Sequence, residues 1–221
     1  LRGIIEHIDH IQKLGIDVLY MTPVFKSNSC HKYDTIDYYQ VDPSFGTLED
    51  LKELVQKAHE RGMKVVMDAV FNHTAREFFA FEDILEKGEK SKYLDWYFIE
   101  GFPIKSGSGE IPNFKCFAYH GGMPKLNLRN PEVEKFITDV ACYWIKECDI
   151  DGWRLDVGDE ISHFFWKRFR EAVKAVKKNM LIIGEIWHYA GDFLEGDEWD
   201  TVMNYPFYLN MIDLLAEEKI N

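Results

Sequence analysis

The sequence alternates short apolar segments with amphipathic segments of helical period, and this alternation constrains the fold more than any other feature. The apolar segments span residues 16–21, 64–71, 150–156, 180–186 and, more weakly, 201–204. The segments with helical periodicity span residues 3–14, 47–61, 131–147 and 160–178. Short strands that alternate with helices are typical of a parallel sheet. The sequence therefore predicts an α/β fold with five parallel strands.

The predicted helices carry capping signals at their ends. Thr47, with Asp50 three residues later, has the pattern of an N-terminal capping box, and Gly62 follows that helix. Pro131 stands in the first turn of the helix at 131–147, after Asn130 as its cap. These signals support the helix boundaries.

Residues 72–128 break the alternation with clustered Gly, Pro, Ser and aromatic residues. A structureless loop of this length is uncommon inside a compact domain, so we expect a small inserted subdomain after the third barrel strand. Five strands with this insertion favour part of a (β/α)8 TIM barrel, about strands 2–6. An open doubly wound sheet is the alternative, but no glycine-rich phosphate loop follows the first strand. The predicted domains are 1–71 with 129–221 for the partial barrel, and 72–128 for the insertion.

Charge and composition limit the partners of the chain. The formal net charge is −12 and Lys and Arg form no cluster, which argues against a nucleic-acid partner. No apolar run is long enough for a membrane span, and no signal peptide is present. Four scattered cysteines without a CxxC pair indicate free thiols in a reducing compartment. We therefore expect a cytoplasmic protein. Secretion stays open, because Leu1 stands inside a predicted helix and suggests a piece of a longer protein.

Polar side chains gather at the carboxyl ends of three predicted strands, where TIM-barrel active sites form. The segments are DAVFNH at 68–73, GWRLD at 152–156 and GEIWH at 184–188. Each segment by itself has a structural explanation, such as an Arg–Asp ion pair or a capped connection. All three together, each at a strand end, favour an active site.

The spacing within these segments suggests acid–base chemistry. Arg154 and Asp156 alternate along a strand, so their side chains share one face. Arg154 is predicted to keep Asp156 ionised and its pKa low, as a nucleophile requires. Glu185 stands beside Ile186 and Trp187, and these apolar neighbours are predicted to raise its pKa and make it a proton donor. A retaining glycosidase uses two carboxyls tuned in this opposite way, roughly 5–5.5 Å apart.

The three segments, in this order, resemble the short sequence blocks of the α-amylase family of glycoside hydrolases. Two further segments resemble the neopullulanase, cyclomaltodextrinase and maltogenic amylase group: MPKLN at 123–127 and HKYDTIDYYQVDPSFGT at 31–47. The resemblance implies a retaining hydrolase of α-1,4 glucosidic bonds in maltodextrins, cyclodextrins, starch or pullulan. Action on α-1,6 bonds stays open.

The resemblance also implies roles for single residues. Asp156 corresponds to the nucleophile and Glu185 to the general acid, which later acts as the base. The substrate-binding residues it implies are His31, Tyr33, Asp68, His73, Arg154, Trp187 and His188, with Asn72 in a supporting role. It implies no cofactor and no catalytic metal, leaves a structural calcium ion near Asn72 open, and makes a homodimer of the intact protein a further expectation.

The chain departs from the pattern of that group at two places. Val157, Gly158 and Asp159 precede Glu160 where the group usually carries Ala and Asn before the Glu, which leaves bond preference and transfer activity open. A fourth block, which supplies an Asp and a His from the seventh strand, is absent from the 221 residues. We therefore expect this chain on its own to be inactive or nearly so, with exposed sheet edges at both ends of the arc.

Two other functions compete with glycoside hydrolysis. A metal-dependent hydrolase could use Asp68, His73, Asp156 and Glu185 as ligands, although HxH and HExxH pairs are lacking. A non-catalytic scaffold is the other alternative, but such a relative is expected to have lost the acid or the nucleophile. Both residues are present here.

Overall fold

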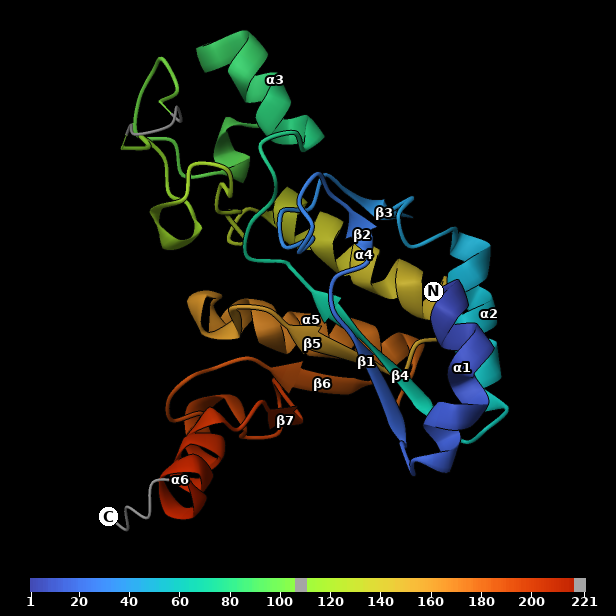
Figure 1. Cartoon of the computed structure of the whole chain (residues 1–221). Coiled ribbons are helices and arrows are strands. Elements are labelled where there is room, and N and C mark those ends of the chain that lie inside the picture. Colours follow the sequence, from blue (N-terminus) through green and yellow to red (C-terminus); the bar gives the residue numbers. More distant parts are fainter. Residues whose placement is uncertain (106–110, 217–221) are drawn as a thin grey trace.

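A parallel five-stranded sheet forms the centre of the molecule, in a computed structural model that describes residues 1–105 and 111–216 (Figure 1). Its strands are β1 Val18–Met21, β4 Lys64–Ala69, β5 Gly152–Leu155, β6 Leu181–Gly184 and β7 Thr201–Val202. They are hydrogen-bonded in the order β1-β4-β5-β6-β7, and every neighbouring pair is parallel. The order never reverses, as an arc of a barrel requires and a doubly wound sheet does not allow. The predicted fold class, an α/β partial TIM barrel, is confirmed.

The helices follow the strands and pack next to one another. They are α1 Arg2–Lys13, α2 Leu48–His59, α4 Pro131–Cys148, α5 His163–Val176 and α6 Tyr205–Leu215. The capping box of Thr47 and Asp50 forms as predicted, and the Asn130 side chain accepts from the Glu132 amide. Because α1 contacts α2, α2 contacts α4, and α4 contacts α5, these four helices form a layer against the sheet.

The strands and α5 are shorter than the sequence predicts. β4 ends at Ala69, before Val70 and Phe71, and β5 ends at Leu155, although the Asp156 amide still donates to the Ala69 carbonyl at 3.1 Å. The helix predicted at 160–178 is α5, which begins later, at His163, and ends at Val176; the 3-10 turn η4, Gly158–Glu160, precedes it. Ser162 starts this helix because its hydroxyl accepts from the Phe165 amide.

Aromatic side chains fill the core between the sheet and α4. Trp153 on β5 is fully buried between Phe25 and Phe71, at ring-centroid distances of 6.4 and 5.7 Å. Trp144 of α4 packs on Phe25 at 5.2 Å and donates from Nε1 to the Tyr38 carbonyl at 2.8 Å. Full burial of one such side chain contributes about 1.5–3 kcal/mol. These contacts fix the segment around Tyr38 against the sheet.

A two-stranded antiparallel hairpin follows β1 and was not predicted. It consists of β2 Phe25–Lys26 and β3 Asp37–Val41, which pair irregularly. A strand of two residues carries no periodic signal, so residues 31–47 have the sequence pattern of a loop. The segment between β2 and β3 carries two of the predicted substrate-binding residues.

The segment between β4 and α4 projects beyond the carboxyl ends of the strands (Figure 1). It contains α3 Phe79–Lys87, η1 Gly88–Lys90, η2 Leu94–Trp96 and η3 Phe117–Tyr119, with residues 106–110 outside the described part. Isolated bridges join distant parts of it, including His73 to Lys125 and Tyr97 to Leu126. Outside this segment, the short 3-10 turn η5, Gly191–Phe193, follows β6. The division into domains at 72 and 128 stays a prediction.

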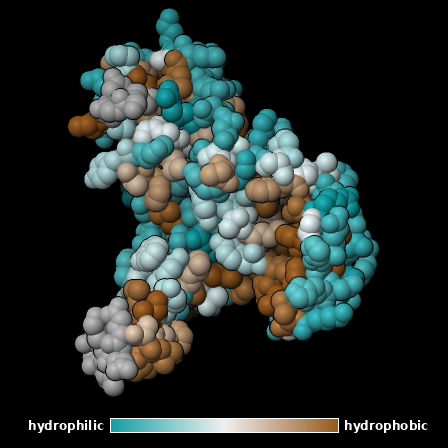
Figure 2. All heavy atoms as spheres, viewed as in Figure 1, coloured by the Kyte–Doolittle hydropathy of each residue, from teal (hydrophilic) through white to brown (hydrophobic). Residues whose placement is uncertain are grey.

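In the described residues, β1 and β7 each have a strand neighbour on one side, so both are edges of the sheet, as predicted. Val18 and Tyr20 on β1 are each 44% exposed. Apolar side chains of α6, among them Phe207 and Leu215, are also exposed, and Figure 2 shows hydrophobic colour on this helix. Within residues 1–105 and 111–216, the helices are too short or too polar to cross a membrane.

Candidate active site

Arg154 joins three carboxylates at the carboxyl end of the sheet. From β5, its Nη1 donates to Asp68 Oδ1 on β4 at 3.0 Å and to Asp156 Oδ1 at 2.8 Å. Its Nη2 forms an ion pair with Glu185 Oε1, after β6, at 2.5 Å. Asp68 and Arg154 are register partners on adjacent strands, which is why they meet. The structure thus brings the three predicted segments together around one guanidinium.

Asp156 does not have the low pKa that the sequence suggested. Burial, with the negative charges of Asp68 and Glu185, outweighs Arg154 and raises the pKa of Asp156 to about 7. The prediction was wrong because it counted Arg154 as a partner of Asp156 alone. The guanidinium is shared by three buried acids, so negative charge remains in excess around Asp156.

Glu185 lies in polar surroundings, whereas the sequence suggested apolar ones. Its Oε2 accepts from the Val157 amide at 3.0 Å, and its Oε1 accepts from the Tyr205 hydroxyl at 3.2 Å. Trp187 does not enclose the carboxyl, because it is 63% exposed and stacks on Tyr205 with centroids 3.9 Å apart. Ile186 is buried in the hydrophobic core. The carboxyl is therefore oriented by specific donors.

Val157 has a backbone conformation that valine rarely adopts. Its φ is 49° and ψ 44°, in the left-handed region. For a β-branched residue this conformation costs on the order of 1–3 kcal/mol, and such strain is common at active sites. Here it turns the chain after Asp156 so that the Val157 amide points at Glu185. The turn links the two predicted catalytic carboxyls.

Tyr33 and Tyr20 both donate to Asp68. Tyr33 Oη lies 3.1 Å and Tyr20 Oη 2.6 Å from Asp68 Oδ2. Asp68 is thereby held against Arg154, and its side chain is fully buried. Burial raises its pKa, while Arg154 and the two hydroxyls oppose the shift. Asp68 thus orients Arg154 and Tyr33.

His73 is buried beside the loop that carries Tyr33. Its Nε2 donates to the Tyr33 carbonyl at 2.9 Å, and its ring stacks on Phe117 at 4.9 Å. Burial lowers the pKa of His73 to about 4, so the imidazole is neutral at physiological pH. With its Nε2 proton on a carbonyl, His73 holds the Tyr33 backbone in place.

A cavity of about 550 Å³ opens above these groups. Among its lining residues are the predicted residues His31, Tyr33, His73, Arg154, Asp156, Glu185 and Trp187. Asp68 lies behind this lining, and Asn72 lines a neighbouring cavity. His188 is mostly exposed and pairs with Asp159 at 3.2 Å, beside the cavity. The binding roles of these residues stay predictions.

Three contacts were missed in the sequence, those of Tyr20, Val157 and Tyr205. Tyr20 lies between half-buried Leu19 and buried Met21 on β1, and nothing in a strand pattern shows that its hydroxyl reaches Asp68. The left-handed φ of Val157 goes against residue preference. Tyr205 begins α6 after the Asn204 cap, so a helix start could have been predicted, but its hydrogen bond to Glu185 could not.

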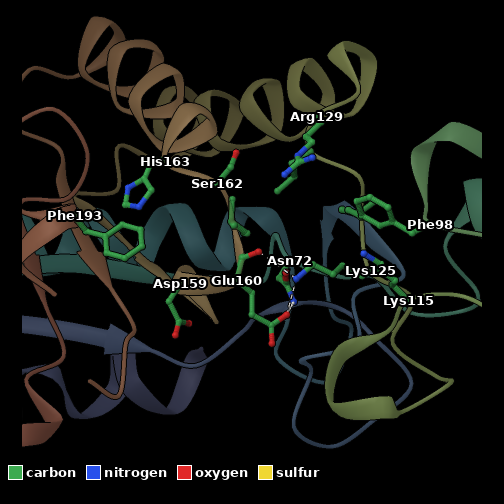
Figure 3. Close-up of a pocket in the computed structure, with 13 residues that line it drawn as sticks. Asn72, Phe98, Lys115, Lys125, Arg129, Asp159, Glu160, Ser162, His163 and Phe193 are labelled. Atoms are coloured by element: carbon green, nitrogen blue, oxygen red, sulfur yellow. Dashed lines mark hydrogen bonds and ion pairs between the residues drawn. The ribbon is translucent and has the colours of Figure 1, made fainter. Parts of the chain in front are cut away.

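A second cavity of about 480 Å³ adjoins the first through Asp159 and Glu160, which line both. Figure 3 shows the side chains of Asn72, Lys125 and Glu160, which line this cavity, close together. Lys125 Nζ lies 2.6 Å from Glu160 Oε2, which also accepts from Asn72 Nδ2 at 3.2 Å. Asn72 Oδ1 itself is buried without a hydrogen-bond partner among the described residues, and the calcium ion left open near Asn72 stays a prediction.

Comparison with known proteins places this site in a family. The alpha amylase catalytic-domain family matches residues 1–221. The chain belongs to the alpha-amylase family. It is 53% identical to a cyclomaltodextrinase of Thermoanaerobacter pseudethanolicus and 48% identical to neopullulanase 2 of Thermoactinomyces vulgaris. Both alignments cover all of this chain, which spans 38% and 37% of those relatives.

Solved structures of family members share the fold closely. A cyclomaltodextrinase superposes with a TM-score of 0.96 at 48% identity, over 98% of this chain and 37% of its own. Cyclic α-maltosyl-(1→6)-maltose hydrolase from Arthrobacter globiformis superposes with a TM-score of 0.95 at 40% identity, over 100% and 49%. The predicted family and its cyclomaltodextrinase-like group are thereby confirmed.

Proposed function

We propose that the intact protein containing this chain is a retaining glycoside hydrolase of α-1,4 glucosidic bonds in maltodextrins and cyclodextrins. Asp156 is the nucleophile that forms a glycosyl–enzyme bond as the leaving oxygen takes a proton from Glu185. Glu185 then removes a proton from the water that releases the sugar. His31, Tyr33 and Trp187 bind the glucose rings, whose hydroxyl groups take the place of water in the cavity.

One observation carries this proposal: a single guanidinium binds both Asp156 and Glu185 in one cavity. Two buried carboxyls on adjacent nitrogens of one planar group are close enough to act on a single glycosidic bond. The raised pKa of Asp156 means that the free site retains a proton near neutral pH. In the proposed reaction, Glu185 donates a proton to the leaving oxygen while Asp156 reacts as the carboxylate.

The arrangement also speaks against the two competing functions. A metal-dependent hydrolase would need a cation between Asp68, Asp156 and Glu185, and Arg154 already supplies the positive charge there. Within the described residues, His, Cys, Asp and Glu side chains form no group of three or more suited to a metal ion. A non-catalytic scaffold has no need of the strained Val157 turn that aims an amide at Glu185.

The deciding experiment is hydrolysis of maltoheptaose and β-cyclodextrin by the intact protein, with the anomer of the first product followed by NMR. Retention gives the α-anomer first. Glu185→Gln should lower kcat on the order of 10³-fold, because the amide cannot donate the proton. Formation of the β-anomer first, or full activity of the Gln variant, would contradict the proposal, and loss of activity on chelation would favour the metal alternative.

The remaining expectations accompany this function. We propose a cytoplasmic location, in keeping with relatives named intracellular maltogenic amylases of Bacillus subtilis. The partner is an α-glucan oligosaccharide. Three further points stay predictions. Pullulan hydrolysis tests cleavage of α-1,6 bonds, and sedimentation tests whether the intact protein is a homodimer. An assay of the isolated 221-residue chain tests whether it is inactive alone.

A further inference from the structure

Lys32 stands between two residues of the substrate cavity but points the opposite way. His31 and Tyr33 line the cavity, in the segment that joins β2 to β3. Within residues 28–34, all of which are described, Lys32 alone is buried, with 8% of its surface exposed. The other residues of 28–34 are half-buried or exposed and mostly polar, so hydrophobic packing contributes little to holding the segment in position.

The Lys32 ammonium is bound at the base of the segment. Its Nζ lies 2.8 Å from Asp42 Oδ2 and donates to the Ser27 carbonyl at 3.0 Å, with the Phe45 ring 5.8 Å away. Asp42 Oδ2 also accepts from the Ser27 amide at 3.1 Å, and Asp42 Oδ1 accepts from the Ser44 amide at 2.9 Å. The pair therefore fastens the middle of the segment to Ser27, which follows β2, and to Asp42, which follows β3.

The backbone at Lys32 connects this buried pair to the cavity. Its φ is 65°, in the left-handed region, and its amide donates to Ser29 Oγ at 3.0 Å. The Tyr33 amide donates to His31 Nδ1 at 3.1 Å, which leaves the proton of a neutral His31 on Nε2. This turn places His31 and Tyr33 on the cavity side while the lysine side chain runs inward.

We propose that Lys32, through its ion pair with Asp42, is a positioning residue that fixes His31 and Tyr33 over the Asp156–Arg154 centre. The inference rests on the proposed function, and it adds a determinant that touches no substrate. We call this pair the latch, because breaking it detaches Lys32, in the middle of the segment, from Ser27 and Asp42, while the parallel sheet beneath stays intact.

The test compares three variants of the intact protein. Lys32→Met alone leaves Asp42 buried without its cation and is expected to destabilise the fold, so Lys32→Met/Asp42→Asn, which removes both charges, is the informative variant. Lys174→Met is the matched control. Lys174 also pairs with a carboxylate, Asp200, and donates to a backbone carbonyl, that of Met180, away from the site.

Hydrogen exchange followed by mass spectrometry reports on the latch without any assay of activity. In the double variant, exchange should rise in a peptide covering 27–42 and stay at the wild-type level elsewhere, with the thermal midpoint nearly unchanged. Lys174→Met should leave that peptide as it is. Unchanged exchange at 27–42 in the double variant would overturn the proposal.

Steady-state kinetics on maltotriose then measure what the latch contributes. We expect kcat of the double variant to fall by at least about tenfold with a smaller change in KM, because misplaced sugar-binding groups act mainly in the transition state. A kcat within about twofold of wild type, despite faster exchange, would show that the position of His31 and Tyr33 does not affect turnover. That result would overturn the role of Lys32 as a positioning residue. If the wild type itself cleaves no α-glucan, the proposed function fails, and the exchange data alone support or overturn the latch.

Discussion

The two ends of β5 carry equally buried aspartates in opposite electrostatic settings. Asp151 precedes the strand and is 7% exposed, and Asp156 follows it and is 6% exposed. Asp151 accepts from His59 Nε2 at 2.6 Å, Lys177 Nζ at 2.9 Å and the Val65 amide at 3.0 Å. Asp156 shares one guanidinium with two other carboxylates.

The pKa shifts of the two aspartates have opposite signs. Burial opposes ionisation at Asp151, but hydrogen bonds from His59, Val65 and Lys177 outweigh it and lower the pKa. At Asp156, burial and the neighbouring acids raise the pKa to about 7. At the amino end of the strand, the charge of Asp151 is neutralised by its partners and stabilises the fold. At the carboxyl end, the carboxylates outnumber the one guanidinium, as is common at active sites.

The largest effect is expected from Asp156→Asn. The amide keeps the shape of the side chain but cannot attack an anomeric carbon, so kcat of the intact protein should fall on the order of 10⁴-fold. Single-turnover kinetics on maltoheptaose measure the loss. If the variant retained wild-type turnover, Asp156 would not be the nucleophile. The electrostatic difference between the two ends of β5 would then have no catalytic consequence.

The same substitution should stabilise the protein at alkaline pH. The folded pKa of Asp156 is raised from 3.8 to about 7, so the folded state binds the proton more tightly than the unfolded state. That contribution is fully present below pH 4 and is lost as pH rises to 7. At pH 8, Asp156→Asn should therefore gain about 1–2 kcal/mol over wild type, with a smaller difference at pH 5. Thermal unfolding at both pH values tests the sign.

The opposite behaviour is expected from Asp151→Asn. Its lowered pKa means that the ionised form stabilises the fold above pH 3.8, and that this stabilisation disappears as pH falls below that value. At pH 7 the variant should lose about 2 kcal/mol of unfolding free energy, because charged hydrogen bonds to a buried group are removed. Urea unfolding at pH 7 measures this loss, and kcat at a temperature where the variant is folded should change by less than about twofold.

The strand ends also show what sequence alone can predict. The five parallel strands follow from apolar periodicity, the pairing of Arg154 with Asp156 follows from alternation along β5, and the place of Asp68 at the same edge of the sheet follows from its strand end. The opposite pKa shifts do not follow, since Arg154 has one near neighbour in the sequence and three carboxylate partners in space. The bonds of Glu185 to Val157 and Tyr205 depend on a strained turn and a helix start, which local propensity does not reveal.

The smallest effect is expected from Lys177→Met, which removes one of several cations around Asp151. Lys177 Nζ also donates to the carbonyls of Asp149 and Ile150, at 2.8 and 3.0 Å. Because Asp151 keeps His59 and the Val65 amide, and because the lysine side chain is 24% exposed, the cost should be only about 0.5–1 kcal/mol. Urea unfolding in low and high salt measures it, with a smaller difference expected at high salt. A loss as large as that of Asp151→Asn would mean that the amino end, like the carboxyl end, depends on a single cation.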